Sequence, residues 1–274
     1  MKHEPRFPLR LDKLARGAKT PAPTPPAREV LRPQRPVHEA HRDAAQQGRP
    51  SGLGLDSAGV RRSLVQRLQA QGLRDEAVIA ALLAVPRHAF VDAALVTQAY
   101  EDTSLPIGHG QTISKPSVVA RMAELLRAGD SARRTGTLGR VLEVGTGCGY
   151  QAAVLARLAT LVISIERVRP LHERARETLR AMRVDPVRLV YGDGMLGHPP
   201  NAPYDSVIAA AGGQALPQAW LDQMAIGGRL VCPLQRPGTR EQVLVVVDRQ
   251  VHGHVHSIHE SVHFVPLKSG LDSR

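Results

Sequence analysis

Cysteine and aromatic residues are scarce in this chain of 274 residues. The two cysteines, Cys148 and Cys232, share no regular spacing, which argues against a disulfide framework and against a zinc site built from cysteines. Such usage is typical of a reducing compartment, and we expect a cytoplasmic protein. Aromatic residues make up only 3% of the chain, so its core has to consist of aliphatic side chains, and a cluster of aromatics for stacking on nucleic-acid bases is missing.

Long hydrophobic runs are also absent. No apolar segment approaches the roughly 18 residues of a transmembrane helix, and the basic N-terminus lacks the apolar core of a secretory signal. We therefore expect no membrane partner. Hydrophobic residues nevertheless make up 42% of the chain, enough for a sizeable core, and a formal net charge of +11 suits contact with acidic partners.

Residues 1–57 differ in composition from the rest of the chain. Prolines and arginines recur there without apolar periodicity, and such a segment cannot bury enough surface to offset the entropy of ordering. We interpret it as a disordered basic tail. A nucleic-acid-binding arm is the alternative, but Glu29, Glu39 and Asp43 interrupt the positive charge.

The segment that follows is predicted to be helical. Apolar residues at three- and four-residue spacings indicate two short helices between residues 60 and 86, separated at Gly72. Asp75 is suited to cap the second helix, and Pro86 ends it. A third helix is expected to begin near Pro116, since proline is favoured at a first helical position.

From Arg140 onward, short apolar runs alternate with helical stretches. The runs cover residues 141–144, 161–165, 187–191, 206–210, 229–232 and 243–247, and the helices cover about 151–158, 170–182 and 218–224. Fully apolar strands between helices are typical of a parallel sheet with both faces covered. This pattern predicts an α/β domain.

The stretch VLEVGTGCGYQAA, residues 141–153, has the pattern of a ligand-binding turn. A buried strand leads into Gly145, Gly147 and Gly149, and a helix follows. Glycine is required where a backbone turns sharply and approaches a ligand without a Cβ in the way. A tight turn with no ligand is the alternative.

Acidic residues follow at the ends of the next two strands. Glu166 lies 21 residues beyond Gly145, where a carboxylate can accept both hydroxyls of a bound ribose. Asp193, in a turn with Gly194, can accept from an adenine amino group. A solvated strand end and a plain turn are the alternatives for each acid alone. The G-x-G-x-G spacing differs from the G-x-G-x-x-G of pyrophosphate-binding folds and favours an adenosyl cofactor over NAD.

The segment LPIGHGQTISKP, residues 105–116, is the most specific motif of the chain. Together with the motifs above, it resembles the protein-L-isoaspartate O-methyltransferase family. The other matching stretches are VPRHAFV, AYEDTSLPIG, GTGCGYQAAVLA, SIER, YGDG, PQAWLDQM, GGRLVCP and HFVPL. The resemblance covers roughly residues 60–268.

The resemblance implies a doubly wound α/β fold, with a mostly parallel seven-stranded sheet of the Rossmann-like class I methyltransferase type and an N-terminal helical subregion. We expect a methyltransferase domain over residues 58–274. Its parts would be N-terminal helices and an active-site loop (58–135), a cofactor-binding core (136–235) and C-terminal strands (236–274). The resemblance also implies methyl transfer from S-adenosyl-L-methionine, which becomes S-adenosyl-L-homocysteine, to the α-carboxylate of isoaspartyl residues in damaged proteins and peptides. Repair then proceeds through a succinimide, and no metal is expected.

The resemblance assigns site residues by position. Ser114 matches the family's active-site serine. The cofactor-binding candidates are Gln111, Thr112, Glu143, Gly145, Thr146, Gly147, Cys148, Gly149, Glu166, Asp193 and Gly194. Cys148 stands where serine is common in the family, and Ala210 stands where threonine or glycine is common.

The acceptor chemistry limits what the side chains have to do. An α-carboxyl group has a reference pKa near ~3.5, so the acceptor is ionised at neutral pH and needs no general base. Alignment and loss of water remain as the enzyme's contribution. Ser114 lies just before Pro116, at the start of a predicted helix, which is a favourable place for an anion. A role as helix N-cap is the alternative.

Other functions remain as alternatives. They are a class I methyltransferase acting on a small molecule or RNA, a basic nucleic-acid-binding protein with a degenerate enzyme domain, and a nicotinamide dehydrogenase. The GQTIS segment counts against the first, the intact glycine and acid motifs against the second, and the glycine spacing against the third. We expect a monomer with no specific nucleic-acid partner.

Histidines gather near the end of the chain. His252, His254 and His256 alternate, so they would share one face of a strand, and His259 and His263 follow. Such spacing can bind a metal, while a hydrophilic strand face explains it more simply.

Overall fold

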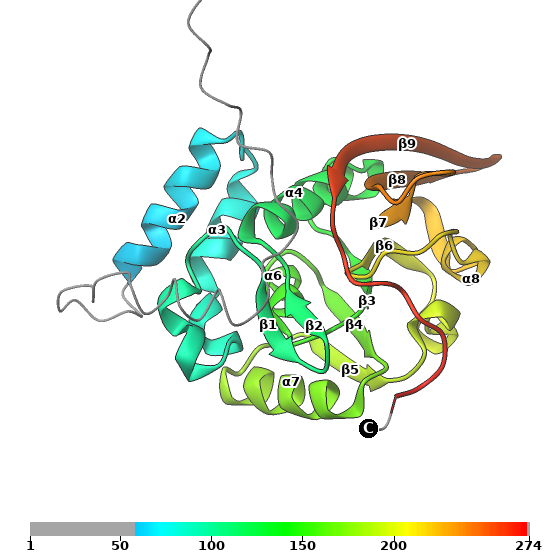
Figure 1. The fold of residues 1–274 in the computed structure, drawn as a ribbon. Coiled ribbons are helices and arrows are strands. Elements are labelled where there is room, and N and C mark those ends of the chain that lie inside the picture. Colours follow the sequence, from blue (N-terminus) through cyan, green and yellow to red (C-terminus); the bar gives the residue numbers. More distant parts are fainter. Residues whose placement is uncertain (1–57, 273–274) are drawn as a thin grey trace, which may run out of the picture. The chain divides into compact units, whose positions relative to one another are not determined.

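A seven-stranded sheet forms the centre of the computed structural model, which describes residues 58–272 (Figure 1). The strand order is β5-β4-β3-β6-β7-β8-β9. The strands are β3 (Arg140–Val144), β4 (Leu161–Glu166), β5 (Val187–Tyr191), β6 (Tyr204–Ala209), β7 (Met224–Gln235), β8 (Gln242–Gln250) and β9 (Gly253–Val262). Strands β3 to β7 run parallel, whereas β8 and β9 pair antiparallel. The expected doubly wound, mostly parallel sheet is confirmed; the predicted tail, residues 1–57, lies outside the described residues.

Helices cover both faces of this sheet. The helices are α2 (Ala58–Ala70), α3 (Glu76–Ala84), α4 (Pro116–Arg127), α5 (Asp130–Thr135), α6 (Tyr150–Ala156), α7 (Arg169–Ala181) and α8 (Gln218–Asp222), with 3₁₀ turns η2 (Arg87–Phe90), η3 (Ala93–Gln98), η4 (Gly194–Leu196) and η5 (Pro199–Asn201). Buried residues of α2, α3, α4, α6 and α7 join one apolar cluster, and α8 contributes to the second. Figure 1 shows α2 and α3 side by side, and α3 also contacts α4 and α6.

Local sequence signals explain several helix ends. Asp75 caps α3, because its Oδ1 accepts a 3.0 Å hydrogen bond from the backbone N–H of Val78. The same helix ends at Val85, directly before Pro86, which cannot continue a helix. Pro116 occupies the first position of α4, as its missing N–H allows. These three predictions from the sequence are confirmed.

Alternation along the strands divides the core in two. On β3, Val141 packs into the cluster under α4 and α6, whereas Leu142 and Val144 pack into the opposite cluster with Trp220 of α8. All four side chains are buried. Burial of each aliphatic side chain contributes about 1.5–3 kcal/mol, so both faces of the sheet contribute to stability.

Three of the strands were not predicted individually. Strands β1 (Leu105–Gly108) and β2 (Gln111–Ile113) form an antiparallel hairpin over the sheet edge, and β9 extends the sheet beyond β8. The chain then leaves β9, red in Figure 1, and passes across the carboxyl ends of the parallel strands to end near β5. Among the described residues, none of the helices combines the length and apolar character needed to cross a bilayer.

Candidate functional site

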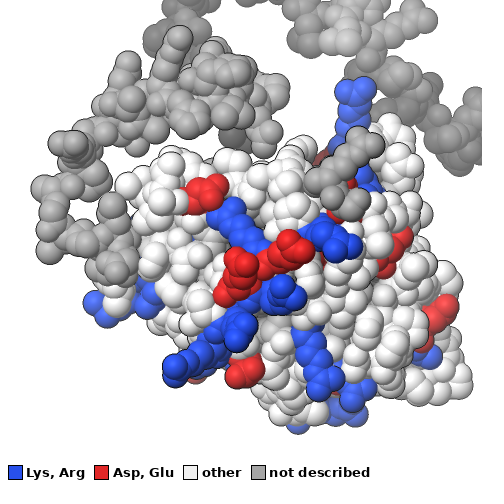
Figure 2. Space-filling view, turned by 90° about the horizontal axis from the view of Figure 1, so that it is seen from below, with Lys and Arg blue, Asp and Glu red and all other residues white. Residues whose placement is uncertain are grey.

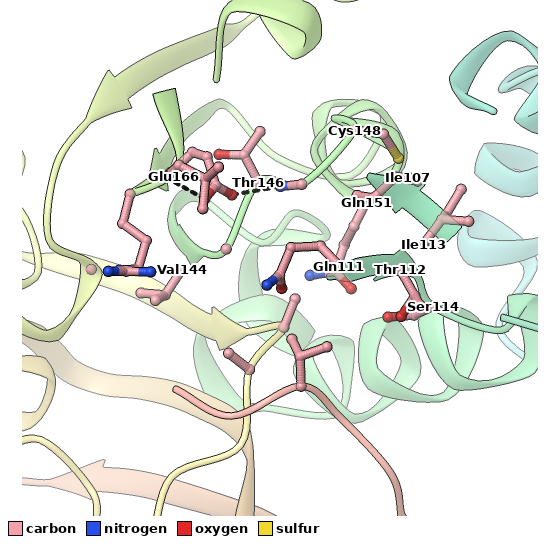
Figure 3. Close-up of a pocket in the computed structure, with 18 of the residues that line it drawn as sticks. Ile107, Gln111, Thr112, Ile113, Ser114, Val144, Thr146, Cys148, Gln151 and Glu166 are labelled. Atoms are coloured by element: carbon pink, nitrogen blue, oxygen red, sulfur yellow. Dashed lines mark hydrogen bonds between the residues drawn. The ribbon is translucent and has the colours of Figure 1, made fainter. Parts of the chain in front are cut away.

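A cavity that opens to solvent lies at the carboxyl ends of β3, β4 and β6, and its empty space, the open part included, is about 870 Å³ (Figure 3). The glycine turn after β3 forms one wall, the β1–β2 hairpin forms a second, and residues 265–268 form a third. This edge is where ligands bind in open parallel sheets. Of the predicted site residues, the cavity is lined by Gln111, Thr112, Ser114, Gly145, Thr146, Gly147, Cys148, Glu166 and Gly194, but not by Glu143, Gly149 or Asp193.

The glycine turn requires glycine for two separate reasons. Gly145 has φ +92° and Gly147 has φ +56°, conformations that L side chains rarely adopt. In addition, a Cβ on Gly147 would lie 3.2 Å from Cδ1 of Ile107, in the hairpin on the other side of the cavity. At Gly145 and Gly147 the turn therefore lines the cavity with backbone atoms alone.

Glu166 holds this turn in place at the end of β4. Its Oε2 accepts a 2.8 Å hydrogen bond from the N–H of Gly147, and its Oε1 accepts a 2.9 Å hydrogen bond from the N–H of Val168. The carboxylate is nearly buried yet lines the cavity. Each carboxylate oxygen has two lone pairs, so Glu166 can still accept from ribose hydroxyls while it holds the backbone.

Glu143 lies behind the cavity wall and is fully buried. Ser164 donates a 2.5 Å hydrogen bond to its Oε2, and Thr146 shares a 2.6 Å hydrogen bond with the same Ser164 hydroxyl. Burial raises the pKa of Glu143 to about 8, although the hydrogen bond from Ser164 opposes the shift. Within the described residues, Glu143 Oε1 and the Nε2 of Gln151, a cavity-lining side chain, have no hydrogen-bond partner.

Cys148 is buried in the same wall, directly after Gly147. Burial raises the pKa of its thiol to about 11. The thiol is therefore neutral at physiological pH, which suits a small wall residue rather than a nucleophile.

Ser114 lies between β2 and α4 and faces the cavity from the side opposite Glu166 (Figure 3). The N-cap of α4 is Lys115, so the N-cap alternative for Ser114 is wrong. Its hydroxyl forms no hydrogen bond within the part of the chain that the structure describes. It is therefore a free donor beside the N-terminus of a helix of 12 residues.

Asp193 and Gly194 follow β5, as the sequence predicts. Asp193 Oδ1 accepts from the N–H of Met195 at 2.9 Å, and its Oδ2 accepts from the N–H of Gly270 at 2.6 Å. Gly194 reaches the cavity, and its carbonyl accepts a 2.8 Å hydrogen bond from the indole N–H of Trp220. The Asp193 carboxylate thus lies just outside the cavity, bound to backbone on both sides.

Sequence reasoning missed several cavity residues. Gln151 follows the glycine turn on α6, and Arg167 follows Glu166, so both stand beside recognised motifs. Residues 265–267 belong to the HFVPL match and Lys268 follows it, but nothing in that pattern indicates that they cross to the cavity.

The histidine-rich strand does not assemble a metal site. His254 and His256 lie on β9, at the far edge of the sheet from β5. Within residues 58–272, no three His, Cys, Asp or Glu side chains lie together as metal ligands.

Comparison with known proteins points to one family. A family model described as protein-L-isoaspartate(D-aspartate) O-methyltransferase matches residues 60–272. A protein from Methylibium petroleiphilum named protein-L-isoaspartate O-methyltransferase is 58% identical over 269 residues, covering 98% of this chain and 97% of the relative. A protein of the same name from Leptothrix cholodnii is 57% identical over 274 residues, covering 97% and 94% of the two chains.

Solved structures show the same likeness. A structure described as a protein-L-isoaspartate O-methyltransferase matches with a TM-score of 0.69 and 28% identity, over 77% of this chain and 67% of that one. A Plasmodium falciparum protein in complex with S-adenosyl-L-homocysteine matches with a TM-score of 0.62 and 24% identity, over 76% and 98% of the two chains, and indicates a shared fold.

Proposed function

This chain belongs to the protein-L-isoaspartate(D-aspartate) O-methyltransferase family, and from that premise we propose its reaction. It transfers a methyl group from S-adenosyl-L-methionine to the α-carboxylate of L-isoaspartyl residues in damaged proteins. The observation that carries this proposal is one cavity lined both by the glycine turn, from Gly145 to Cys148, and by Ser114 with its free hydroxyl.

The cavity fits the cofactor in shape and charge. Bare backbone at Gly145 and Gly147 leaves room for a methionine chain, and Glu166 presents a carboxylate to a ribose. The unpartnered Oε1 of Glu143 and Nε2 of Gln151 supply buried polar groups beside that position. The Glu166 carboxylate in the cavity wall suits a ligand that carries a sulfonium and an ammonium group.

We assign the site residues as follows. Gln111 and Thr112 cover the cofactor from the hairpin, and the turn from Gly145 to Gly149, with Thr146 and Cys148, holds its methionine part. Glu143 stands behind this part, Glu166 binds the ribose, and Asp193 with Gly194 borders the adenine. Most of these residues line one cavity, which supports the assignment; Glu143, Gly149 and Asp193 lie beside it.

Ser114 orients the acceptor carboxylate. The acceptor is ionised at neutral pH, so no residue has to remove a proton from it. Bound S-adenosylmethionine supplies a methyl group already activated by the positive charge of its sulfonium. The chain's own residues contribute position: the Ser114 hydroxyl and the N-terminus of α4 hold the anion, and the buried walls remove its water. The later closure to a succinimide needs no residue of this protein.

We further propose the boundaries and setting of this activity. Residues 58–274 form the methyltransferase domain, with helices and active-site loop (58–135), cofactor core (136–235) and C-terminal strands (236–274). The family match over residues 60–272 supports the extent of this domain. The protein acts as a monomer in the cytoplasm, and its two buried, unpaired cysteines support the reducing compartment.

An RNA substrate is the second candidate, favoured only by the net charge of +11. The surface over α7 does not support it. Figure 2 shows basic and acidic side chains interspersed there, and α7 places Glu173 and Glu177 among its arginines. Such a mixed surface lacks the continuous positive potential that binds a phosphate backbone.

Two peptides that differ only in isoaspartate against aspartate test the proposal. Purified protein is incubated with radiolabelled S-adenosylmethionine and each peptide. We expect base-labile label on the isoaspartyl peptide alone. Label on neither peptide, with cofactor binding intact, would leave the fold assignment standing and make RNA the next substrate to test.

A further inference from the structure

The chain from Phe264 to Asp272 is here called the C-terminal strap, and its residues 265–268 form the third wall of the cavity. Its inner part is fixed to the loop after β6. The N–H of Gly212 donates to the carbonyl of Val265 at 2.8 Å, and the N–H of Leu267 donates to the carbonyl of Gly212 at 2.8 Å. These paired backbone bonds anchor the strap beside the cavity mouth.

The outer part of the strap is held by different contacts. Arg167 donates from Nε to the carbonyl of Gly270 at 2.7 Å, and the N–H of Gly270 donates to Oδ2 of Asp193 at 2.6 Å. Asp272 exchanges backbone hydrogen bonds with the segment after β4: its N–H donates to the carbonyl of Arg167 at 2.9 Å, and its carbonyl accepts from Arg169 at 3.0 Å. The carbonyl of Gly270 is therefore bound to the residue after β4, and its N–H is bound to a residue after the neighbouring strand β5.

Hydrophobic burial contributes little to this outer part. Leu271 is 56% exposed, and Lys268, Ser269 and Gly270 are exposed as well. Phe264, by contrast, is 7% exposed, so the inner part is packed and the outer part is not. Hydrogen bonds between exposed groups contribute modestly to stability and exchange readily with water. The outer strap can thus open while its inner anchor stays in place.

We propose that Arg167 is a positioning residue that holds the outer strap closed over the cofactor cavity and so slows the exchange of a bound nucleoside. Arg167 lines the cavity itself and is bonded to the strap through Gly270, so loss of that bond exposes the cavity's adenine end. Asp193, which follows β5, accepts a hydrogen bond from the same strap and helps to hold it. The identity of the nucleoside as S-adenosylhomocysteine rests on the proposed function.

A pair of glycine variants tests the strap without touching the cavity. Gly270 has φ +76° and Gly238, in the turn between β7 and β8, has φ +73°, and an added Cβ meets nothing within 4 Å at either position. Alanine imposes the same backbone strain at both sites. We expect Gly270→Ala to raise the dissociation rate of S-adenosylhomocysteine about fivefold, since that strain opens the strap, and Gly238→Ala to leave the rate unchanged.

The side chain of Arg167 is tested in the same assay. Arg167→Met removes the bond to Gly270 and is expected to raise the dissociation rate about tenfold. Arg167→Lys is expected to raise this rate less, because lysine retains a hydrogen-bond donor. Arg174→Met is the matched control: it removes an arginine of α7 that pairs with Asp92, away from the strap. The one tryptophan, Trp220, reports binding by fluorescence through its bond to Gly194.

Amide hydrogen exchange provides a readout that needs no cofactor. Without ligand, peptides covering residues 268–272 are expected to exchange faster in Gly270→Ala and Arg167→Met than in wild type, and to exchange at the wild-type rate in both controls. If wild-type protein binds no S-adenosylhomocysteine, the proposed function fails. If it binds and all variants release the ligand at the wild-type rate, with unchanged exchange in the strap, the positioning role of Arg167 is overturned.

Discussion

Ser164 donates a 2.5 Å hydrogen bond to Oε2 of Glu143 across the two parallel strands β3 and β4, where the two residues are direct register partners. The bond lies in the core, because both side chains are fully buried. Only one of the two carboxyl oxygens of Glu143 has a partner among the described residues. Burial away from water disfavours the charged form of this carboxyl group and raises the pKa of Glu143 to about 8, against the opposing effect of the hydrogen bond from Ser164.

This shift predicts a pH-dependent contribution to stability. The unfolded chain ionises Glu143 near the ordinary glutamate pKa of 4.5, while the folded chain keeps it neutral up to a pKa of about 8. Its stabilising contribution is therefore complete below pH 4.5 and is lost as the pH rises to about 8, by roughly 4 kcal/mol in total. Urea unfolding of Glu143→Gln should lack this decline, so the variant gains on wild type between pH 5 and about pH 8.

Glu173→Gln, on the exposed face of α7, is the control, because it removes a carboxylate that is not buried. It should follow the wild-type pH profile. A Glu143→Gln profile parallel to wild type would mean that Glu143 is ionised in the folded protein.

Replacement of Ser114 by alanine should slow catalysis and leave the fold intact. The hydroxyl faces the cavity and supports nothing else within the described residues, so its loss removes a donor to the acceptor carboxylate alone. We expect kcat/KM for an isoaspartyl peptide to fall by about 10²-fold, as for loss of one hydrogen-bond donor to a reacting anion. Ser117→Ala, one turn along α4 and outside this cavity, is the matched control. Equal rates in both variants would remove Ser114 from the active site.

Glu166→Gln should weaken cofactor binding and loosen the glycine turn together. Glu166 accepts two backbone hydrogen bonds, from Gly147 and Val168, and a glutamine amide has only one acceptor oxygen. One buried N–H therefore loses its partner, at a cost of about 1–3 kcal/mol in unfolding free energy. Calorimetric titration with S-adenosylhomocysteine should show at least about a tenfold lower affinity, and thermal melting should show the lower stability. Retention of both values would contradict the role given to this carboxylate.

The parallel core could be predicted because its residues leave a pattern along the chain. Val141 to Val144 and Val162 to Ile165 are mostly apolar runs that are buried on both faces, with Glu143 and Ser164 as their polar members, and a turn signal bounds each run. The site motifs follow these runs directly, so the strand order of a doubly wound sheet places Gly145 and Glu166 at the same edge.

The remaining elements depend on contacts that leave no such pattern. Strand β9 is an edge strand with mostly exposed residues, among them Ile258 at 66%, so it lacks the apolar alternation that predicts a strand. The strap is held largely through backbone groups, such as Gly270 N–H to Asp193 across 77 positions of sequence. Backbone groups are the same in every residue, and their pairing cannot be deduced from side-chain type.

The close approach of Gly147 to Ile107 predicts that alanine at position 147 impairs cofactor binding in two ways, through a steric clash and through backbone strain. Gly147 has φ +56°, and an added Cβ would lie 3.2 Å from Cδ1 of Ile107, so the hairpin wall has to move outward. Gly136, after α5, has φ +75° with nothing within 4 Å of an added Cβ, and alanine there imposes backbone strain alone. We expect both variants to lose about 1–2 kcal/mol of unfolding free energy. Only Gly147→Ala should bind S-adenosylhomocysteine less tightly, by at least about tenfold, because only there does the new methyl group displace a wall of the cavity. Equal affinities of the two variants by calorimetric titration would show that the hairpin moves aside without weakening binding. The turn would then need glycine for its backbone conformation alone.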